Sequence, residues 1–317
     1  MPSIKQPFST QICPYGEGAI AQAADLIGNG HCVAIPTETV YGLAADATNG
    51  AAVAGIYKAK GRPSFNPLIV HVADLAHGQT IAVFDDVARA LAQRFWPGPL
   101  TLVLPRQMES GIASLATAGL DTIAIRVPAH PAMQALIRKS GKPLAAPSAN
   151  ASGTISPTRA THVSKSLGGQ IPMIIDAGAT KHGLESTIIA IEPQCLRLLR
   201  PGPIDALLLA EASGLPVEMN LSDTIEAPGQ LASHYAPSKP LRLGATIAND
   251  DEWLIGFGDI SGRATLSSTG DLIEAAAALF DALHVADQSP CASIAVAPIP
   301  DIGLGAAIND RLNRAAF

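Results

Sequence analysis

Pro147-Ser148-Ala149-Asn150 follows the apolar run 144–146, and this junction of a short strand with a small polar turn decides the fold class. Turns at strand ends are where α/β folds place their ligands. A second stretch, Lys58-Ala-Lys60-Gly-Arg62-Pro63, puts three of the 21 basic residues within five positions, on a segment bounded by glycine and proline. Basic side chains there suit phosphate oxygens better than a core. Together the two stretches predict a nucleotide site in an acidic enzyme.

Short apolar runs and helical patterns alternate up to about residue 212. The apolar runs predict strands over 32–35, 68–72, 100–104, 122–127, 144–146, 173–176, 187–191 and 196–199. Segment 36–43 is expected to be a loop that leaves the first strand. Helices are expected over 18–27, 51–58, 85–95 and 131–139. Many short strands mixed with helices predict an α/β or α+β domain.

The periodicity weakens after residue 214, where prolines interrupt the chain at Pro216, Pro228, Pro237 and Pro240. We therefore expect a catalytic domain over 1–214, an interdomain linker over 215–240 and a small α/β domain over 241–317. In the small domain the pattern predicts strands over 253–257 and 293–297 and helices over 271–286 and 304–316. The linker segment 227–237 is too specific in sequence for a passive tether, and we expect it to act as a lid.

Composition excludes several classes of protein. The net charge is -6 over 317 residues, whereas a protein that clamps duplex nucleic acid usually shows a broad basic face. The apolar runs are too short for a membrane span, and segment 1–17 lacks a signal pattern. The four cysteines form no C-x-x-C pair, which is typical of reduced thiols. We expect a cytoplasmic protein that binds a small charged ligand.

Known phosphate, hydrolase and metal motifs are missing from the sequence. It contains no G-x-x-x-x-G-K-[ST] loop and no G-x-S-x-G elbow, and Gly256-Phe257-Gly258 lacks the third glycine of a dinucleotide motif. His162 and His182 have no metal-ligand spacing, so no metal site is assigned to protein side chains. Another phosphate-binding architecture is therefore needed.

Ordered motifs over nearly the whole chain resemble the YrdC-like family, in particular its two-domain L-threonylcarbamoyladenylate synthases. The stretches that carry this resemblance are Pro36 to Leu43, Lys58 to Pro67, Phe95 to Leu102, Ala124 to Pro128, Ala146 to Asn150, Glu185 to Ile188, Leu199 to Gly202, the linker pair His234-Tyr235, Gly303 to Gly305 and Asn309 to Leu312. The resemblance implies a twisted mixed-sheet catalytic domain followed by a smaller Rossmann-like α/β domain.

The resemblance also implies a reaction. L-threonine, bicarbonate and ATP, with Mg²⁺, would give threonylcarbamoyl-AMP and pyrophosphate. The product would pass to a tRNA threonylcarbamoyltransferase that modifies adenosine 37, so direct tRNA binding is not required. The reaction needs no protein nucleophile, because it depends on alignment and on neutralising triphosphate charge. That charge would come from Lys58, Lys60, Arg62 and Arg200, together with Mg²⁺.

Site residues follow from the same resemblance. It implies an ATP site formed by Arg62, Asn66, Thr122, Ser148, Asn150, Ser156, Arg200 and Tyr235. It implies a threonine site formed by Thr39, His71, Arg126, Ser186 and the Ala146 backbone. An arginine facing the amino-acid carboxylate is chemically sensible, because its fork matches two oxygens.

Some alternatives stay open at this point. From periodicity alone, His71 reads as a satisfied core histidine, and Ser148 and Asn150 could simply cap a turn. Glu38 could be a general base or the partner of a lysine. An RNA-binding or ribosome-assembly module with a YrdC-like fold is the main alternative function. A carbamoyltransferase of the hydrogenase-maturation type is a second one, although such chains carry zinc-binding cysteine pairs that this sequence lacks.

Overall fold

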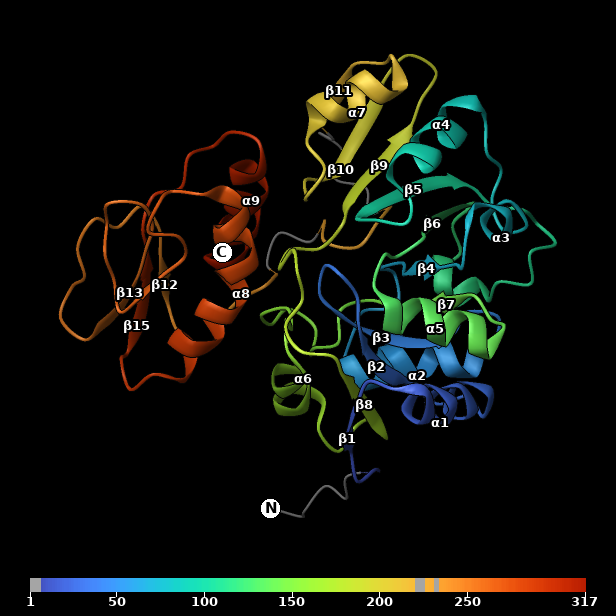
Figure 1. Ribbon diagram of the computed structural model, residues 1–317, viewed down its shortest axis with the longest axis horizontal. Helices are drawn as coiled ribbons and strands as arrows, with labels where there is room; N and C mark the ends of the chain where they lie inside the picture. The colour runs from blue at the N-terminus through green and yellow to red at the C-terminus, as the bar shows by residue number, and fades with distance from the viewer. Residues whose placement is uncertain (1–6, 220–225, 231–233) are drawn as a thin grey trace.

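The computed structural model describes residues 7–219, 226–230 and 234–317. It is a mixed α/β structure with two sheets, which confirms the expected fold class (Figure 1). The large sheet has eleven strands in the order β1-β8-β2-β3-β7-β4-β6-β5-β9-β10-β11, and the small sheet has four in the order β12-β15-β13-β14. In the described ranges, no helix is long and apolar enough to cross a membrane.

The large sheet mixes parallel and antiparallel neighbours, so its strands reach the site from both directions. Its strands are β1 (Gln11–Pro14), β2 (Val33–Pro36), β3 (Tyr41–Asp46), β4 (Ile69–His71), β5 (Leu100–Pro105), β6 (Thr122–Arg126), β7 (Leu144–Ala145), β8 (Met173–Asp176), β9 (Thr187–Ile191), β10 (Leu196–Arg200) and β11 (Val217–Met219). Strands β4 and β6 are parallel, and His71 lies opposite Arg126 in their register.

Helices cover this sheet and are held by specific caps. They are α1 (Glu17–Gly28), α2 (Gly50–Lys60), α3 (Leu75–Gln79), α4 (Asp86–Phe95), α5 (Pro131–Ser140), α6 (Ala160–Leu167) and α7 (Ala206–Ser213), with a 3-10 turn, η1 (Ser114–Thr117). The Asn49 side chain accepts from two backbone N–H groups at the start of α2, and Gly61 ends that helix at a φ of 60°.

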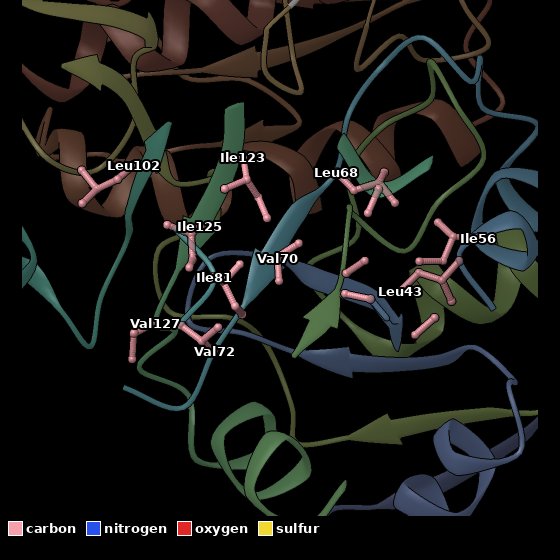
Figure 2. Packing of buried hydrophobic residues seen from close by; sticks show 14 of the residues in the cluster. Leu43, Ile56, Leu68, Val70, Val72, Ile81, Leu102, Ile123, Ile125 and Val127 are labelled. Carbon is pink, nitrogen blue, oxygen red and sulfur yellow. The ribbon is translucent and has the colours of Figure 1, made fainter. Parts of the chain in front are cut away.

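Strand alternation separates the core from the site. In β4 and β6, Val70, Ile123 and Ile125 point into the main core, which Figure 2 shows together with Leu43 of β3. Ile69 and Ala124 belong to a separate cluster, which includes Ala227 of segment 226–230. His71 and Arg126 share the parity of Ile69 and Ala124, so they leave the sheet on the side opposite the main core.

The small unit packs its helices against the large one. It contains β12 (Leu241–Arg242), β13 (Glu252–Gly256), β14 (Ala264–Thr265), β15 (Ser293–Val296), α8 (Leu272–Gln288) and α9 (Leu304–Ala315). Figure 1 shows α8 and α9 on the side of the small sheet that faces the large unit. One hydrophobic cluster joins Phe280 and Ile308 of these helices to Val40, Ile155 and Leu184 of the large unit.

Gly183 lies directly against α8. A Cβ on this glycine would be 2.3 Å from the carbonyl oxygen of Ala276 and 2.6 Å from the Cα of Ala277, and its φ is +71°. The two backbones therefore touch here, and only glycine fits.

Several sequence expectations were wrong in local detail. Residues 41–43 belong to β3, which pairs with β2, rather than to a loop. Helix α2 runs two residues further than predicted, so Lys58 and Lys60 lie in its last turn and only Arg62 follows Gly61. The sequence patterns also missed α3, η1, α6, α7, β1, β11, β12 and β14.

The expected linker, 215–240, lies only partly within the described residues, because 220–225 and 231–233 fall outside them. Within it, β11 pairs in parallel with β10 and so extends the large sheet.

Candidate active site

A small cavity of about 40 Å³ lies where the large sheet, segment 226–230 and the residues after 233 meet. The cavity is lined by eight of the predicted site residues, namely Thr39, Arg62, His71, Arg126, Ala146, Ser148, Arg200 and Tyr235. Thr39 follows β2, and Ala146 and Ser148 follow β7. His71 is the last residue of β4, so strand ends supply several of these residues, as expected for ligand sites of α/β folds.

Arg62 and Arg200 give the cavity its charge. Arg62 is 8% exposed and donates to Asn66 Oδ1 at 2.6 Å and to the Pro67 carbonyl at 2.9 Å. Arg200 is 4% exposed and donates to the carbonyl and hydroxyl oxygens of Ser186, both at 3.0 Å. Neither forms an ion pair with any carboxylate of the described chain. Two buried guanidiniums that lack an ion-pair partner in the described part of the structure favour an anionic ligand.

Burial lowers the pKa of Arg62 to about 10, and the positive charge of Arg200 also lowers it. The pKa of Arg200 is likewise lowered, first by burial. Both groups remain charged at neutral pH. An anion between them would therefore relieve both the desolvation and their mutual repulsion.

Arg126 lines the cavity and belongs to a buried network. Its Nη2 contacts Glu38 Oε1 at 2.6 Å, its Nη1 donates to Thr39 Oγ1 at 3.1 Å, and its Nε donates to the Gly98 carbonyl at 3.1 Å. Burial raises the pKa of Glu38, but Arg126 and the Ala129 N–H outweigh it, so the net pKa is lowered. Glu38 is therefore a carboxylate paired with an arginine. Part of the Arg126 fork is left for a ligand.

His71 is neutral and has an unsatisfied nitrogen. It is 2% exposed, and its Nδ1 has no hydrogen-bond partner within the described structure. Burial lowers its pKa to about 3, with a further contribution from Arg126. A buried, unpaired ring nitrogen costs free energy unless a ligand pairs with it. This observation favours the functional interpretation of His71 over that of a satisfied core histidine.

His234 and Tyr235 close the cavity. Tyr235 is 1% exposed, and its ring stacks on that of Phe280 in α8 with 5.6 Å between the ring centroids. Its backbone is in the left-handed region, with a φ of 65°. Its hydroxyl has no partner in the part of the chain that is described. The His234 ring packs edge-on against it at 4.1 Å, and burial lowers the pKa of His234 to about 3.

Five other predicted site residues lie one layer behind the cavity, where they hold its lining. Lys60 Nζ donates to the carbonyls of Ser148 and Asn150 at 2.6 and 2.5 Å, so it fixes the Pro-Ser-Ala-Asn turn. Burial lowers the pKa of Lys60 well below its usual range. The remaining contacts of this layer are Asn66 with Arg62, Ser156 with Glu185, and Ser186 with Arg200.

Two predicted residues are not brought to the cavity. Lys58 is exposed and lines a separate hollow with His31 and Gly55. Thr122 begins β6 opposite Pro105, four residues before Arg126.

The cavity is also lined by Thr37, Glu185 and His234, which are not among the site residues predicted from the sequence. Each lies inside a stretch that carries the family resemblance. Membership in those stretches was the available signal.

A twisted mixed sheet with a basic cavity of this kind places the chain among the YrdC-like α/β proteins. Residues 25–202 match the Sua5/YciO/YrdC family, described as "Telomere recombination", and residues 203–317 match "Threonylcarbamoyl-AMP synthase, C-terminal domain". The chain belongs to the two-domain threonylcarbamoyl-AMP synthase family, which confirms the resemblance seen in the sequence.

Relatives match over almost the full chain. A threonylcarbamoyl-AMP synthase of Bacillus subtilis (strain 168) is 43% identical, covering 94% of this chain and 92% of the relative. A synthase of Pyrococcus abyssi is 40% identical, covering 95% and 94%. The crystal structure of P. abyssi Sua5 complexed with L-threonine is similar with a TM-score of 0.88 and 37% identity, covering 97% of each chain. These relatives support the synthase interpretation and not the RNA-binding alternative.

Proposed function

We propose that this chain is an enzyme that makes L-threonylcarbamoyl-AMP from L-threonine, bicarbonate and ATP and releases pyrophosphate. The observation that carries the proposal is a pair of buried guanidiniums, Arg62 and Arg200, that have no ion-pair partner among the described residues. They share one cavity with the Nδ1 of His71, which has no hydrogen-bond partner there. The guanidiniums suit a triphosphate, and the histidine suits a small polar substrate.

Threonine would bind on the side of Arg126. In this proposal the free N–H groups of Arg126 receive the threonine carboxylate, while Glu38 and Gly98 hold the guanidinium in place. His71 is neutral, so its Nδ1 can donate a hydrogen bond to the threonine hydroxyl or accept one from it, depending on the tautomer. Thr39 Oγ1 lies on the same side, 2.8 Å from Thr37 Oγ1.

ATP would bind on the side of Arg62, Ser148 and Arg200. A cavity of about 40 Å³ has room for roughly three water molecules, which is far less than a nucleotide needs. In this proposal His234 and Tyr235 therefore move out to admit ATP and return over it. Closure would exclude water from the reactive mixed anhydride.

The chemistry requires alignment rather than a protein nucleophile. The threonine amine adds to bicarbonate with loss of water, or to CO2 with loss of a proton, to give a carbamate. A carbamate oxygen then attacks the α-phosphorus, and pyrophosphate leaves. Arg62 and Arg200 neutralise the negative charge of this leaving group. Mg²⁺ is proposed to enter with ATP as part of the substrate and to share the phosphate charge. Among the described residues, no group of three or more His, Cys, Asp or Glu could hold a metal ion.

The division into a catalytic domain over 1–214, an interdomain linker that acts as a lid over 215–240 and a small α/β domain over 241–317 is part of this proposal. We also propose that the product goes to a tRNA threonylcarbamoyltransferase, without a need for this chain to bind tRNA. The reaction would then take place in the cytoplasm, where its acceptor tRNA is used.

Product analysis tests the function directly. The protein would be incubated with ATP, Mg²⁺, ¹³C-bicarbonate and L-threonine, with pyrophosphate and the labelled adenylate measured together. We expect equal amounts of both, and neither when threonine is omitted. Pyrophosphate release that is independent of threonine, with no labelled adenylate, would contradict the proposal.

A further inference from the structure

Arg311 reaches from α9 of the small unit into the large one. It is 0% exposed, and its Nε contacts Glu185 Oε2 at 2.9 Å while its Nη2 donates to the Pro201 carbonyl at 2.9 Å. Its Nη1 contacts a second carboxylate, Asp310 Oδ2 of the same helix, at 2.6 Å. Its guanidinium also lies 5.2 Å from the centre of the Tyr235 ring. Arg311 therefore joins the small unit to one residue of the cavity wall and to the residue that closes the cavity.

Glu185 is a buried carboxylate on the wall of the cavity. The Ser156 hydroxyl donates to its Oε1 at 2.5 Å, and Arg311 holds its Oε2. Burial raises the pKa of Glu185, but the charges of Arg311 and then Arg200 outweigh it, so the carboxyl stays ionised. Glu185 and Arg200 line the same cavity, and Arg200 donates to Ser186, the residue next to Glu185. The ion pair of Glu185 is nevertheless with Arg311 and not with Arg200.

This arrangement matters because a buried carboxylate must be neutralised by some cation. If Arg311 were absent, Arg200 would be a nearby guanidinium without a carboxylate partner. An ion pair between Glu185 and Arg200 would then compete with any anion that Arg200 binds. The same carboxylate would also add a negative charge to the wall of a cavity that has to accept a triphosphate.

We propose that Arg311 is a positioning residue for nucleotide binding: it neutralises Glu185 and so keeps Arg200 free for the phosphates of ATP. The proposal rests on the proposed function, in which Arg200 contacts ATP. It gives the C-terminal domain a chemical task, because the charge that releases Arg200 comes from α9. The motif Asn309 to Leu312, which the sequence singled out without a role, then supplies this charge.

The test compares Arg311→Gln, Glu185→Gln and the double variant in threonine-dependent pyrophosphate release. We expect Arg311→Gln to raise the KM for ATP roughly tenfold or more and to change the KM for threonine less than about threefold. Glu185→Gln removes the competing charge. The double variant should therefore bring the KM for ATP back to within about threefold of that of Glu185→Gln alone. A residue that merely supported the fold would not be rescued in this way.

Two further variants keep the result interpretable. Arg242→Gln is the control, because it breaks another Arg–Glu pair of the small unit, with Glu252 at 2.5 Å, and should leave the KM for ATP unchanged. Arg311→Lys retains the charge and should affect the KM for ATP less than Arg311→Gln. If Arg311→Gln does not fold, calorimetric binding of a non-hydrolysable ATP analogue to Arg311→Lys, alone and with Glu185→Gln, makes the same comparison.

Equal changes in both KM values would overturn the proposal, as would a double variant no better than Arg311→Gln. The wild-type protein in the same assay reports on the reaction itself. Failure of the proposed function would therefore appear as the absence of threonine-dependent pyrophosphate release by the wild-type protein. Failure of the Arg311 proposal would appear only when the KM values of the variants are compared with one another.

Discussion

Replacing Tyr235 by phenylalanine separates two roles of this residue. The ring packs on Phe280 and under Arg311, but the hydroxyl is buried without a partner in the described structure. A buried hydroxyl without a hydrogen bond costs about 1–3 kcal/mol. Tyr235→Phe should therefore leave the free energy of unfolding unchanged or raise it by about 1 kcal/mol, which corresponds to roughly 2–4 °C in Tm.

The same change should weaken ATP binding. If the hydroxyl pairs with the nucleotide when the linker closes over it, its loss removes one hydrogen bond of about 0.5–1.5 kcal/mol. The KM for ATP should then rise roughly 2- to 12-fold while the KM for threonine stays constant. Initial rates of pyrophosphate release at varied ATP, together with thermal unfolding of the same samples, provide both numbers.

Tyr41 is the matched control. It is also fully buried, but its hydroxyl donates to the Gly178 carbonyl at 2.7 Å. Tyr41→Phe should therefore lower the free energy of unfolding by about 1 kcal/mol. A similar decrease in the free energy of unfolding of Tyr235→Phe would show that the Tyr235 hydroxyl already has a hydrogen-bond partner in the ligand-free protein. An unchanged KM for ATP would remove the hydroxyl from the nucleotide site.

Three other predictions test the site. Arg62→Ala should raise the KM for ATP at least tenfold, because one charge-assisted contact is worth about 1.5–3 kcal/mol; near-normal kinetics of the folded variant would exclude Arg62 from the phosphate site. Threonine should be preferred over valine by a factor on the order of 10⁴ and over serine by roughly 10–200, measured as kcat/KM for adenylate formation from each amino acid. Equal rates with valine would exclude a site that hydrogen-bonds the threonine hydroxyl. Because burial lowers the pKa of His71 and His234 to about 3, below the unfolded value of about 6.5, the unfolded state binds more protons between these values. The free energy of unfolding should have its full value above about pH 6.5 and fall by about 2 kcal/mol per histidine from pH 7 to 5, measured by urea titration at each pH. A free energy of unfolding that does not change over this range would contradict the burial of both rings.

Much of the fold was predictable because local signals agree with the tertiary structure. Asp85 caps α4 and Gly141 ends α5, and both helices were predicted within one residue. Strand β3 was missed because its residues follow Pro36-Thr-Glu-Thr, which is typical of a loop, while Tyr41 to Asp46 are all buried by neighbours distant in sequence. Tertiary burial overrode the local pattern there.

The site was predictable as a set of residues but not as a network. The resemblance named Arg126 and Arg200, yet only the folded chain shows that Arg126 is paired with Glu38 and that Arg200 has no carboxylate partner among the described residues. Of the three basic residues of the cluster, the structure brings only Arg62 to the cavity. Helix α2 turns Lys58 toward solvent and Lys60 toward the Ser148 turn. Arg311 pairs with a residue 126 positions away, and no sequence spacing reports such a contact.

The contact at Gly183 limits how the two units can be recombined. A helix grafted in place of α8 would need residues as small as Ala276 and Ala277 at the point of contact, because the loop backbone leaves no space for a larger side chain. The segment around Gly183 also leads directly to Glu185. A chimera that joined the large unit to an unrelated partner domain would therefore disturb the wall of the cavity unless helix and loop were transferred together. For protein engineering, the exchangeable module is the small unit plus this loop.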